Sequence, residues 1–279
     1  MRNSPLLSVL LLLGSFAGHA QSPTTELGFG PALSFYGGDL SGLQFDDYFD
    51  NINVGATVFV RQPLAGPFDW RLGFSVLPLS GDDAQEGRLR NLNFTNDLLE
   101  LSAVIDWRMF ALRTGNGPVV FYLFGGAAGY YHNPKTNFQG TQVALQPLGT
   151  EGQGTNGLGR RYTKFQLAVP AGGGIKLPVG PNWAIQGEFG GRITFTDYLD
   201  DVGAADVTYD EVLAGNGPLA AALYNREYEL SGEEPGGPLS NSDRLRGNEV
   251  RDYYYAGTVT LIYRFGGAYG NRNARCPTF

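Results

Sequence analysis

Histidine is the side chain best suited to move a proton near neutral pH, and residues 21–279 contain one, His132, in the sequence HNPK. A hydrolase would also need a nucleophile and a carboxylate arranged around this base. No serine, histidine and aspartate spacing of that kind accompanies His132. The sequence therefore predicts that the protein is not an enzyme and has no catalytic residue. A hydrolase acting on membrane lipid, with His132 as its base, is the alternative.

Oxygen donors that could bind calcium gather at Asp46, Asp47, Asp50 and Asn51. They lack the twelve-residue loop with a closing glutamate that such a site uses, so we interpret them as a solvated acidic loop. The whole chain has 27 acidic against 20 basic residues and no clustered basic face for nucleic acid. We predict no metal, no cofactor and no nucleic-acid partner.

Charged side chains occupy every second position in several apolar segments. In residues 99–109, Glu100, Asp106 and Arg108 alternate with leucine, isoleucine and tryptophan. Such charges cannot face lipid, so they must point into a lumen. The lumen of an eight-stranded barrel is just wide enough for side chains to fill it, and we expect a salt-bridged plug rather than a conducting pore. The side chains assigned to this lumen are Arg61, Asp69, Arg71, Glu100, Asp106, Arg108, Lys164, Lys176, Glu188, Arg192 and Arg264.

The segment 252–265, DYYYAGTVTLIYRF, indicates what kind of element holds these charges. Its odd-numbered residues form an apolar face with aromatic residues at both ends, and its even-numbered face is smaller and more polar. A strand that crosses lipid, with its ends at the two interfaces, has this pattern. A soluble β-sandwich also alternates, but it does not place tryptophan or tyrosine at both ends of its outward faces.

The alternation recurs in eight segments, separated by short turns and long connections in strict alternation. We predict an all-β fold, an eight-stranded antiparallel transmembrane β-barrel with long extracellular loops and short periplasmic turns, whose last strand pairs with its first. One predicted strand, 119–131, is apolar on both faces and its orientation stays open. The predicted strands are 26–35, 52–61, 68–77, 99–109, 119–131, 165–177, 183–195 and 252–265; the long connections are 37–51, 80–93, 132–161 and 196–250.

Both ends of the chain are predicted to lie outside the barrel domain, 21–265. Residues 1–20 combine Arg2, an apolar centre and a small-x-small end, the pattern of a cleavable signal peptide. Its removal would leave 19 basic and 27 acidic residues, a net charge of −8. Beyond residue 13 no apolar run approaches the ~18 residues of a membrane helix. Export and a barrel fold together predict the cell outer membrane.

Residues 266–279 form a tail that extends past Phe265, the terminal aromatic residue of the last strand. We expect the tail to hang into the periplasm, either as a frayed end or docked to a partner. Cys276 is the one cysteine, so an internal disulfide is excluded, and in an oxidising periplasm it could form an intermolecular one. The predicted partner-binding residues are Tyr269, Arg272, Arg275, Cys276, Pro277 and Phe279.

The connection 196–250 is the longest, with twelve acidic residues against three arginines. We expect a loop with one short helix near 219–228. Loops of this length are usually functional or disordered, and the sequence does not indicate what this one binds. A small pore or an adhesin is a further alternative function.

Several segments resemble one family. They are RRYTKFQLAVPAGGGIK (160–176), WAIQGEFGGRITFTDYLDDV (183–202), the closing DYYYAGTVTLIYRF, YGGDL (36–40), YHNPK (131–135) and the terminal Cys-Pro-x-Phe. Together they are similar to the PorG-like outer-membrane β-barrel proteins associated with the type IX secretion system. The resemblance implies a non-enzymatic component of a protein-secretion machinery that associates with the periplasmic ring formed by the PorK lipoprotein and PorN. Residues 204–248 do not match the family pattern.

Overall fold

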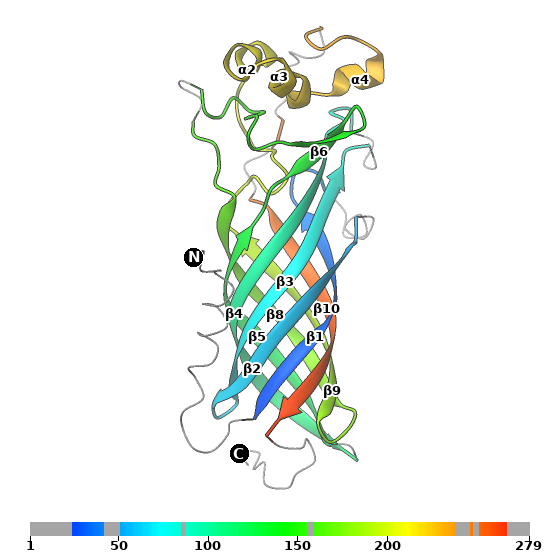
Figure 1. The fold of residues 1–279 in the computed structure, drawn as a ribbon, viewed down its shortest axis with the longest axis vertical. Coiled ribbons are helices and arrows are strands. Elements are labelled where there is room, and N and C mark those ends of the chain that lie inside the picture. The colour runs from blue at the N-terminus through cyan, green and yellow to red at the C-terminus, as the bar shows by residue number, and fades with distance from the viewer. Residues whose placement is uncertain are drawn as a thin grey trace, which may run out of the picture.

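A computed structural model describes residues 24–41, 51–84, 88–115, 117–155, 159–237, 246–247 and 251–266. Within these residues the chain forms ten strands, eight of which make a closed antiparallel ring (Figure 1). The eight are, in ring order, β1 (Thr25–Gly37), β2 (Asn53–Ala65), β3 (Phe68–Asp82), β4 (Asn93–Thr114), β5 (Gly117–Tyr131), β8 (Phe165–Pro178), β9 (Trp183–Thr194) and β10 (Tyr253–Phe265).

The ring closes where β10 pairs with β1. Their register runs from Thr25 opposite Phe265 to Gly37 opposite Tyr253. Closure leaves no open edge in the ring and pairs the backbone groups inside the protein, as lipid requires. The predicted eight-stranded barrel, closed by its first and last strands, is confirmed.

The outward faces of the strands are apolar and exposed. Phe29 of β1 and Phe189 of β9 are each 51% exposed, whereas the inward Ala32 and Ser34 are fully buried. Aromatic pairs lie at both ends of this surface: the rings of Trp183 and Tyr263 are 4.8 Å apart at one end. At the other end Tyr255 contacts Phe35 at 5.4 Å and Phe189 at 5.9 Å. An apolar belt between two aromatic girdles is the outer surface of a membrane barrel.

The orientation of β5, which the sequence leaves open, follows from its register with β4. Tyr130 lies opposite Glu100 and Phe124 opposite Asp106. Directly opposed residues share a face of a sheet, so these aromatic side chains point into the lumen. Both are buried, whereas Leu123, next to Phe124, is exposed on the outer face. The lumen thus receives large aromatic side chains from a strand whose sequence carries no charge to mark its inner face.

The connection 132–161, predicted as a loop, contains a hairpin instead. Its strands are β6 (Lys135–Phe138) and β7 (Thr141–Ala144), and Lys135 pairs with Thr95 of β4. The two residues between them, Gln139 and Gly140, have φ of 49° and 77°, as a two-residue hairpin turn requires. β3 and β4 also extend into the predicted loop 80–93, because their pairing continues to Asp82 opposite Asn93.

The connection 196–250 holds three described helices rather than one: α2 (Tyr209–Asn216), α3 (Pro218–Tyr224) and α4 (Glu227–Ser231). Thr208 and Glu211 form a capping box at the start of α2. Gly217, at a φ of 88°, then allows α3 to begin at Pro218. Figure 1 shows the helices stacked beyond one end of the barrel. None of the described helices is long and apolar enough to cross a membrane.

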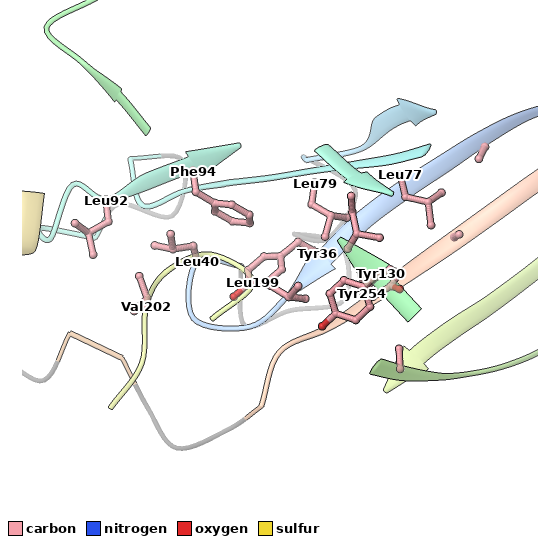
Figure 2. Packing of buried hydrophobic residues seen from close by; sticks show 14 residues of the cluster. Tyr36, Leu40, Leu77, Leu79, Leu92, Phe94, Tyr130, Leu199, Val202 and Tyr254 are labelled. Atoms are coloured by element: carbon pink, nitrogen blue, oxygen red, sulfur yellow. The ribbon is translucent and has the colours of Figure 1, made fainter. Parts of the chain in front are cut away.

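The same end of the barrel is filled by an apolar cluster (Figure 2). Leu199 and Val202, from the connection after β9, are 0% and 1% exposed. They pack with side chains of the strand ends, and the ring of Tyr36 meets that of Phe94 edge to face at 4.9 Å. The labelled strand residues and neighbours in this cluster are Tyr36, Leu40, Leu77, Leu79, Leu92, Phe94, Tyr130 and Tyr254. The mouth of the barrel is therefore occupied by the chain itself.

Candidate functional site

The lower part of the lumen is organised around Glu26 of β1. Its carboxylate lies 3.0 Å from Nζ of Lys176, 3.2 Å from Arg61 and 2.6 Å from Arg264. These three cations come from β8, β2 and β10, so one carboxylate ties four strands together. Sequence analysis did not assign Glu26 to the lumen. The signal that could have identified it is its place in the alternation, since it shares a face with Gly28 and Ala32 of the same strand.

Two arginines cross the middle of the lumen. Nε of Arg61, in β2, lies 2.6 Å from Asp106 of β4, and Nη2 of the same arginine donates to Oε1 of Gln186 in β9 at 2.7 Å. Arg71 of β3 also contacts Asp106, at 2.9 Å, and reaches Glu188 of β9 at 2.6 Å. β9 lies on the opposite side of the ring from β2 and β3 in the pairing order. These side chains therefore span the lumen, and the predicted salt-bridged plug is confirmed.

A second charged layer lies nearer the mouth. Arg192 of β9 pairs with Glu100 of β4 at 3.2 Å, and the hydroxyl of Tyr254 donates to the same carboxylate at 2.8 Å. Between this pair and Arg71 there is a cavity of about 30 Å³. That volume holds about two water molecules, given that one needs roughly 10–15 Å³ of this kind of space. The cavity separates two layers of ion pairs and belongs to the plug.

Two of the predicted lumen residues differ from the rest. Arg108 lies at the rim, with its side chain 39% exposed and 3.3 Å from the buried Asp69. Lys164, predicted to point inward from a strand, lies outside one: it precedes β8, and its carbonyl accepts a hydrogen bond from the backbone of His132 at 2.9 Å. The alternating pattern of the sequence begins one residue before β8, which starts at Phe165.

The mouth of the barrel is closed by a group of three side chains, here called the latch: Tyr36, Asp200 and Asp252. The Tyr36 hydroxyl lies 2.6 Å from Oδ1 of Asp252 and 2.7 Å from Oδ2 of Asp200. The Leu199 amide donates to Asp252 at 2.7 Å, and the Val202 amide donates to Asp200 at 2.8 Å. The latch thereby joins the DYLDDV sequence to β1 and to the start of β10.

The latch geometry favours a retained proton. One hydroxyl has one hydrogen, so it can donate to only one of two carboxylates. The second short contact is a hydrogen bond only if the other carboxyl is itself protonated and donates to the hydroxyl oxygen. Burial raises the pKa of Asp200 and of Asp252. The nearby carboxylate of Asp39 raises the pKa of Asp200 further, and that of Asp200 raises the pKa of Asp252 further. The geometry and the direction of both pKa shifts favour retention of a proton by the latch.

The next aspartate, Asp201, makes a separate set of contacts. Its carboxylate accepts from the hydroxyl of Tyr162 at 2.6 Å and from the hydroxyl of Thr150, and lies 3.7 Å from Arg246. Arg246 also lies 3.4 Å from Glu151, whose pKa burial raises to about 7. The two adjacent aspartates thus have different partners: Asp200 contacts Tyr36 of β1, and Asp201 contacts Thr150, Tyr162 and Arg246 of the extracellular loops.

His132 is buried rather than placed on an open rim. It has no exposed surface, its Nε2 lies 3.1 Å from the carbonyl oxygen of Thr163, and its ring stacks on Tyr162 with centroids 5.6 Å apart. Burial lowers its pKa to about 4, so the imidazole is neutral at physiological pH. A base sealed from water in this way cannot reach a lipid at the surface, and this geometry does not favour the hydrolase alternative.

Other predicted sites lie outside the described residues. Asp46, Asp47 and Asp50 fall in 42–50, and the six predicted partner-binding residues of the tail fall in 267–279. Within the described part of the chain, no group of three or more histidine, cysteine, aspartate or glutamate side chains is arranged to hold a metal ion. Partner binding by the tail stays a prediction.

A closed eight-stranded ring, an apolar belt between aromatic girdles and a charged interior define an outer-membrane β-barrel protein. Neither a protein-family model nor a curated protein matches the sequence. Solved structures of outer-membrane barrels are similar to it at low identity.

The attachment invasion locus protein Ail of Yersinia pestis has a TM-score of 0.40 and 11% identity, covering 88% of this chain and 100% of its own. Neisserial surface protein A has a TM-score of 0.37 and 8% identity, covering 86% and 97%. A major outer membrane protein from Thermus thermophilus has a TM-score of 0.37 and 13% identity, covering 86% and 99%. The strand pairing of this chain, and not these likenesses, defines its fold.

Proposed function

We propose that this barrel is a non-enzymatic outer-membrane anchor for a protein-secretion assembly of the type IX kind. One observation carries the first part of the proposal: ion pairs such as Arg71 to Glu188, at 2.6 Å, cross the whole lumen. A barrel filled in this way is unsuited to conduction and acts through its two ends. The buried His132 likewise favours a role without catalysis.

The assignment to a secretion assembly rests on the sequence resemblance to the PorG-like proteins. The matching segments include β8, the DYLDDV sequence of the latch and the closing strand β10. β8 and β10 form part of the barrel wall, and the DYLDDV sequence closes the mouth. Because these segments serve the barrel itself, we propose that the tail binds the partner, a ring of the PorK and PorN type.

Removing residues 266–279 tests this proposal. The shortened barrel is expected to insert into the outer membrane, because β10 ends at Phe265, and to lose co-purification with the periplasmic ring in mild detergent. A matched Cys276→Ser variant, purified with and without reductant, separates a disulfide from non-covalent docking. Unchanged co-purification of the shortened chain would reject tail docking, and absence of ring proteins from the full-length preparation would reject the assembly itself.

A small pore is the competing function, and conductance separates the two. Full-length barrel reconstituted in a planar bilayer is expected to give no single-channel steps. Discrete steps that persist after removal of contaminating porins would favour a pore over an anchor.

A further inference from the structure

A second surface of interest lies on the extracellular side, where the top of the β3–β4 pair meets the β6–β7 hairpin. It is an open groove of about 430 Å³, here called the polar shelf. Its size falls within the range of small-molecule sites, roughly 300–1,000 Å³. The residues that line it are Asn51, Ser80, Gly81, Asp82, Asn93, Phe94, Thr95, Asn137 and Gln142.

Strand pairing places the polar side chains of the shelf together. Ser80 lies opposite Thr95 and Asp82 opposite Asn93. Opposed residues share a face of a sheet, so the four side chains line one side of the β3–β4 pair. They continue the alternation of the apolar belt below, where Val76 lies opposite Leu99. The outward face therefore changes from apolar to amide and hydroxyl within a few residues.

Several hydrogen-bonding groups on the shelf are available. The Oδ1 of Asn93 accepts from the Thr136 hydroxyl at 2.7 Å, while its amide nitrogen donates to no group among the described residues. Gln142 likewise accepts from Thr95 at 3.5 Å through its oxygen, leaving its nitrogen to solvent. Asn137, across the hairpin from Gln142, is exposed. Amide groups that donate and accept at adjacent points match a ligand rich in hydroxyl groups.

The charge of the shelf does not favour an anionic ligand. Among the described lining residues the one ionisable side chain is Asp82; Lys135, opposite Thr95 on β6, lies beside the shelf and is not one of its lining residues. Arg226 contacts Thr136 of the same hairpin, but it is buried and paired with Glu229 at 2.9 Å. Phosphate and sulfate groups are bound by arginine, lysine or helix termini, and the carboxylate of Asp82 would repel them.

The height of the shelf points to the same class of ligand. Ser80 follows Val76 by four residues, about 13 Å along the strand at 3.3 Å per residue. With a strand tilt of about 40°, the shelf stands roughly 10 Å above the last apolar pair. That level lies beyond the ~5–7 Å of headgroups on one side of an ordinary bilayer. Sugars carried by outer-leaflet glycolipids reach it, as do soluble saccharides.

We propose that the polar shelf binds a neutral saccharide, through amide and hydroxyl contacts from β3, β4 and the β6–β7 hairpin. Two sources offer this chemistry: the sugar chain of a glycolipid in the same membrane, and a free or foreign-cell glycan. The proposal does not depend on the secretion role, because the shelf lies at the opposite end of the barrel from Phe265, the last residue of β10.

Detergent-purified full-length barrel is tested by saturation-transfer NMR against neutral glucan, mannan and galactan oligosaccharides, a sulfated oligosaccharide, and lipopolysaccharide with or without its outer sugar chain. Binding of a free neutral oligosaccharide indicates a soluble source. Binding confined to lipopolysaccharide that carries its sugar chain indicates the protein's own membrane. Both results support the proposal.

The variant Asn137→Ala with Gln142→Ala removes two side chains of the shelf and is expected to weaken binding by about tenfold or more. Thr141→Ala, an exposed residue of the same hairpin that does not line the shelf, is the control and should bind normally. Failure of every neutral probe to bind overturns the proposal. So does preference for the sulfated probe, or undiminished binding by the double variant once protease resistance shows that the hairpin is folded.

Discussion

Tyr36 and Asp252 stand 216 positions apart in the chain, yet the hydroxyl of one lies 2.6 Å from the carboxyl of the other at the barrel mouth. Tyr36→Phe removes this hydroxyl and leaves two buried carboxyls without it. We expect the free energy of unfolding to fall by about 1–3 kcal/mol, measured by urea denaturation of the barrel in micelles. Tyr131→Phe, in which the ring still packs on Phe165, is the control and should change stability little. Equal losses in the free energy of unfolding for the two variants would show that the Tyr36 hydroxyl does not stabilise the mouth.

The latch should loosen as the pH rises. Asp200 and Asp252 have raised pKa values in the folded protein, so the folded state retains protons that the unfolded state has lost. Their contribution is complete below the ordinary aspartate pKa of about 4 and declines as the pH rises through the raised values. The groups facing them are Tyr36, Asp39, Asp197 and Arg246.

Limited proteolysis of the extracellular loops should therefore be slower at pH 5 than at pH 8. Asp200→Asn keeps a hydrogen-bonding group without a titrating proton, and we expect it to reduce this difference. If Asp200→Asn shows the same difference in cleavage rate between pH 5 and pH 8, groups other than Asp200 control the accessibility of the loops.

The lumen network should be sensitive to loss of a single cation. Arg61→Met would leave Asp106 and Glu26 buried with fewer partners, and we expect a loss of about 3–5 kcal/mol in the free energy of unfolding. Arg113→Met, at an exposed position of β4, is the matched control. Heat-dependent mobility on gels, which reports whether the barrel stays folded, gives an independent measurement. A loss below about 1 kcal/mol for Arg61→Met would contradict the network.

His132 should behave as a structural residue. His132→Ala removes a buried ring and is expected to cost about 2–4 kcal/mol, by analogy with other large-to-small core substitutions. The lowered pKa, about 4, means that the wild-type contribution is present above about pH 6.5 and is lost as the pH falls toward 4. Urea denaturation at pH 7 and pH 5 checks both statements. Loss of a lipid-processing activity without loss of stability would reinstate the hydrolase.

The periodicity of the sequence predicted the barrel because lipid and lumen impose opposite requirements on alternate residues. The ends of β10 illustrate this: Tyr263 and Tyr255 lie in aromatic girdles on opposite sides of the belt. The same rule assigned Arg61, Asp106 and Glu188 to the lumen. The alternation rule could not orient β5, because both faces of that strand are apolar. Its orientation follows from its register with β4.

The mouth could not be predicted, because it is made by contacts between residues distant in the chain. Nothing local to Asp200 indicates that it meets Tyr36, 164 positions away, and acidic residues in a long loop are ordinarily solvated. The predicted helix 219–228 overlaps α3 and α4, whereas α2 was not predicted. These helices are short, and α2 and α3 are stabilised by packing on each other rather than by a long amphipathic pattern. An alternating sequence pattern predicts the strands because it recurs in each of them, whereas the contacts that close the mouth occur once and follow no pattern.

Asp252 immediately precedes β10, and this position couples closure of the mouth to closure of the ring. During folding the ring cannot close until the last strand reaches β1, since these two pair with each other. The same arrival carries Asp252 to Tyr36. A chain in which β10 has not paired with β1 therefore lacks both the pairing that closes the ring and the Tyr36–Asp252 contact at the mouth.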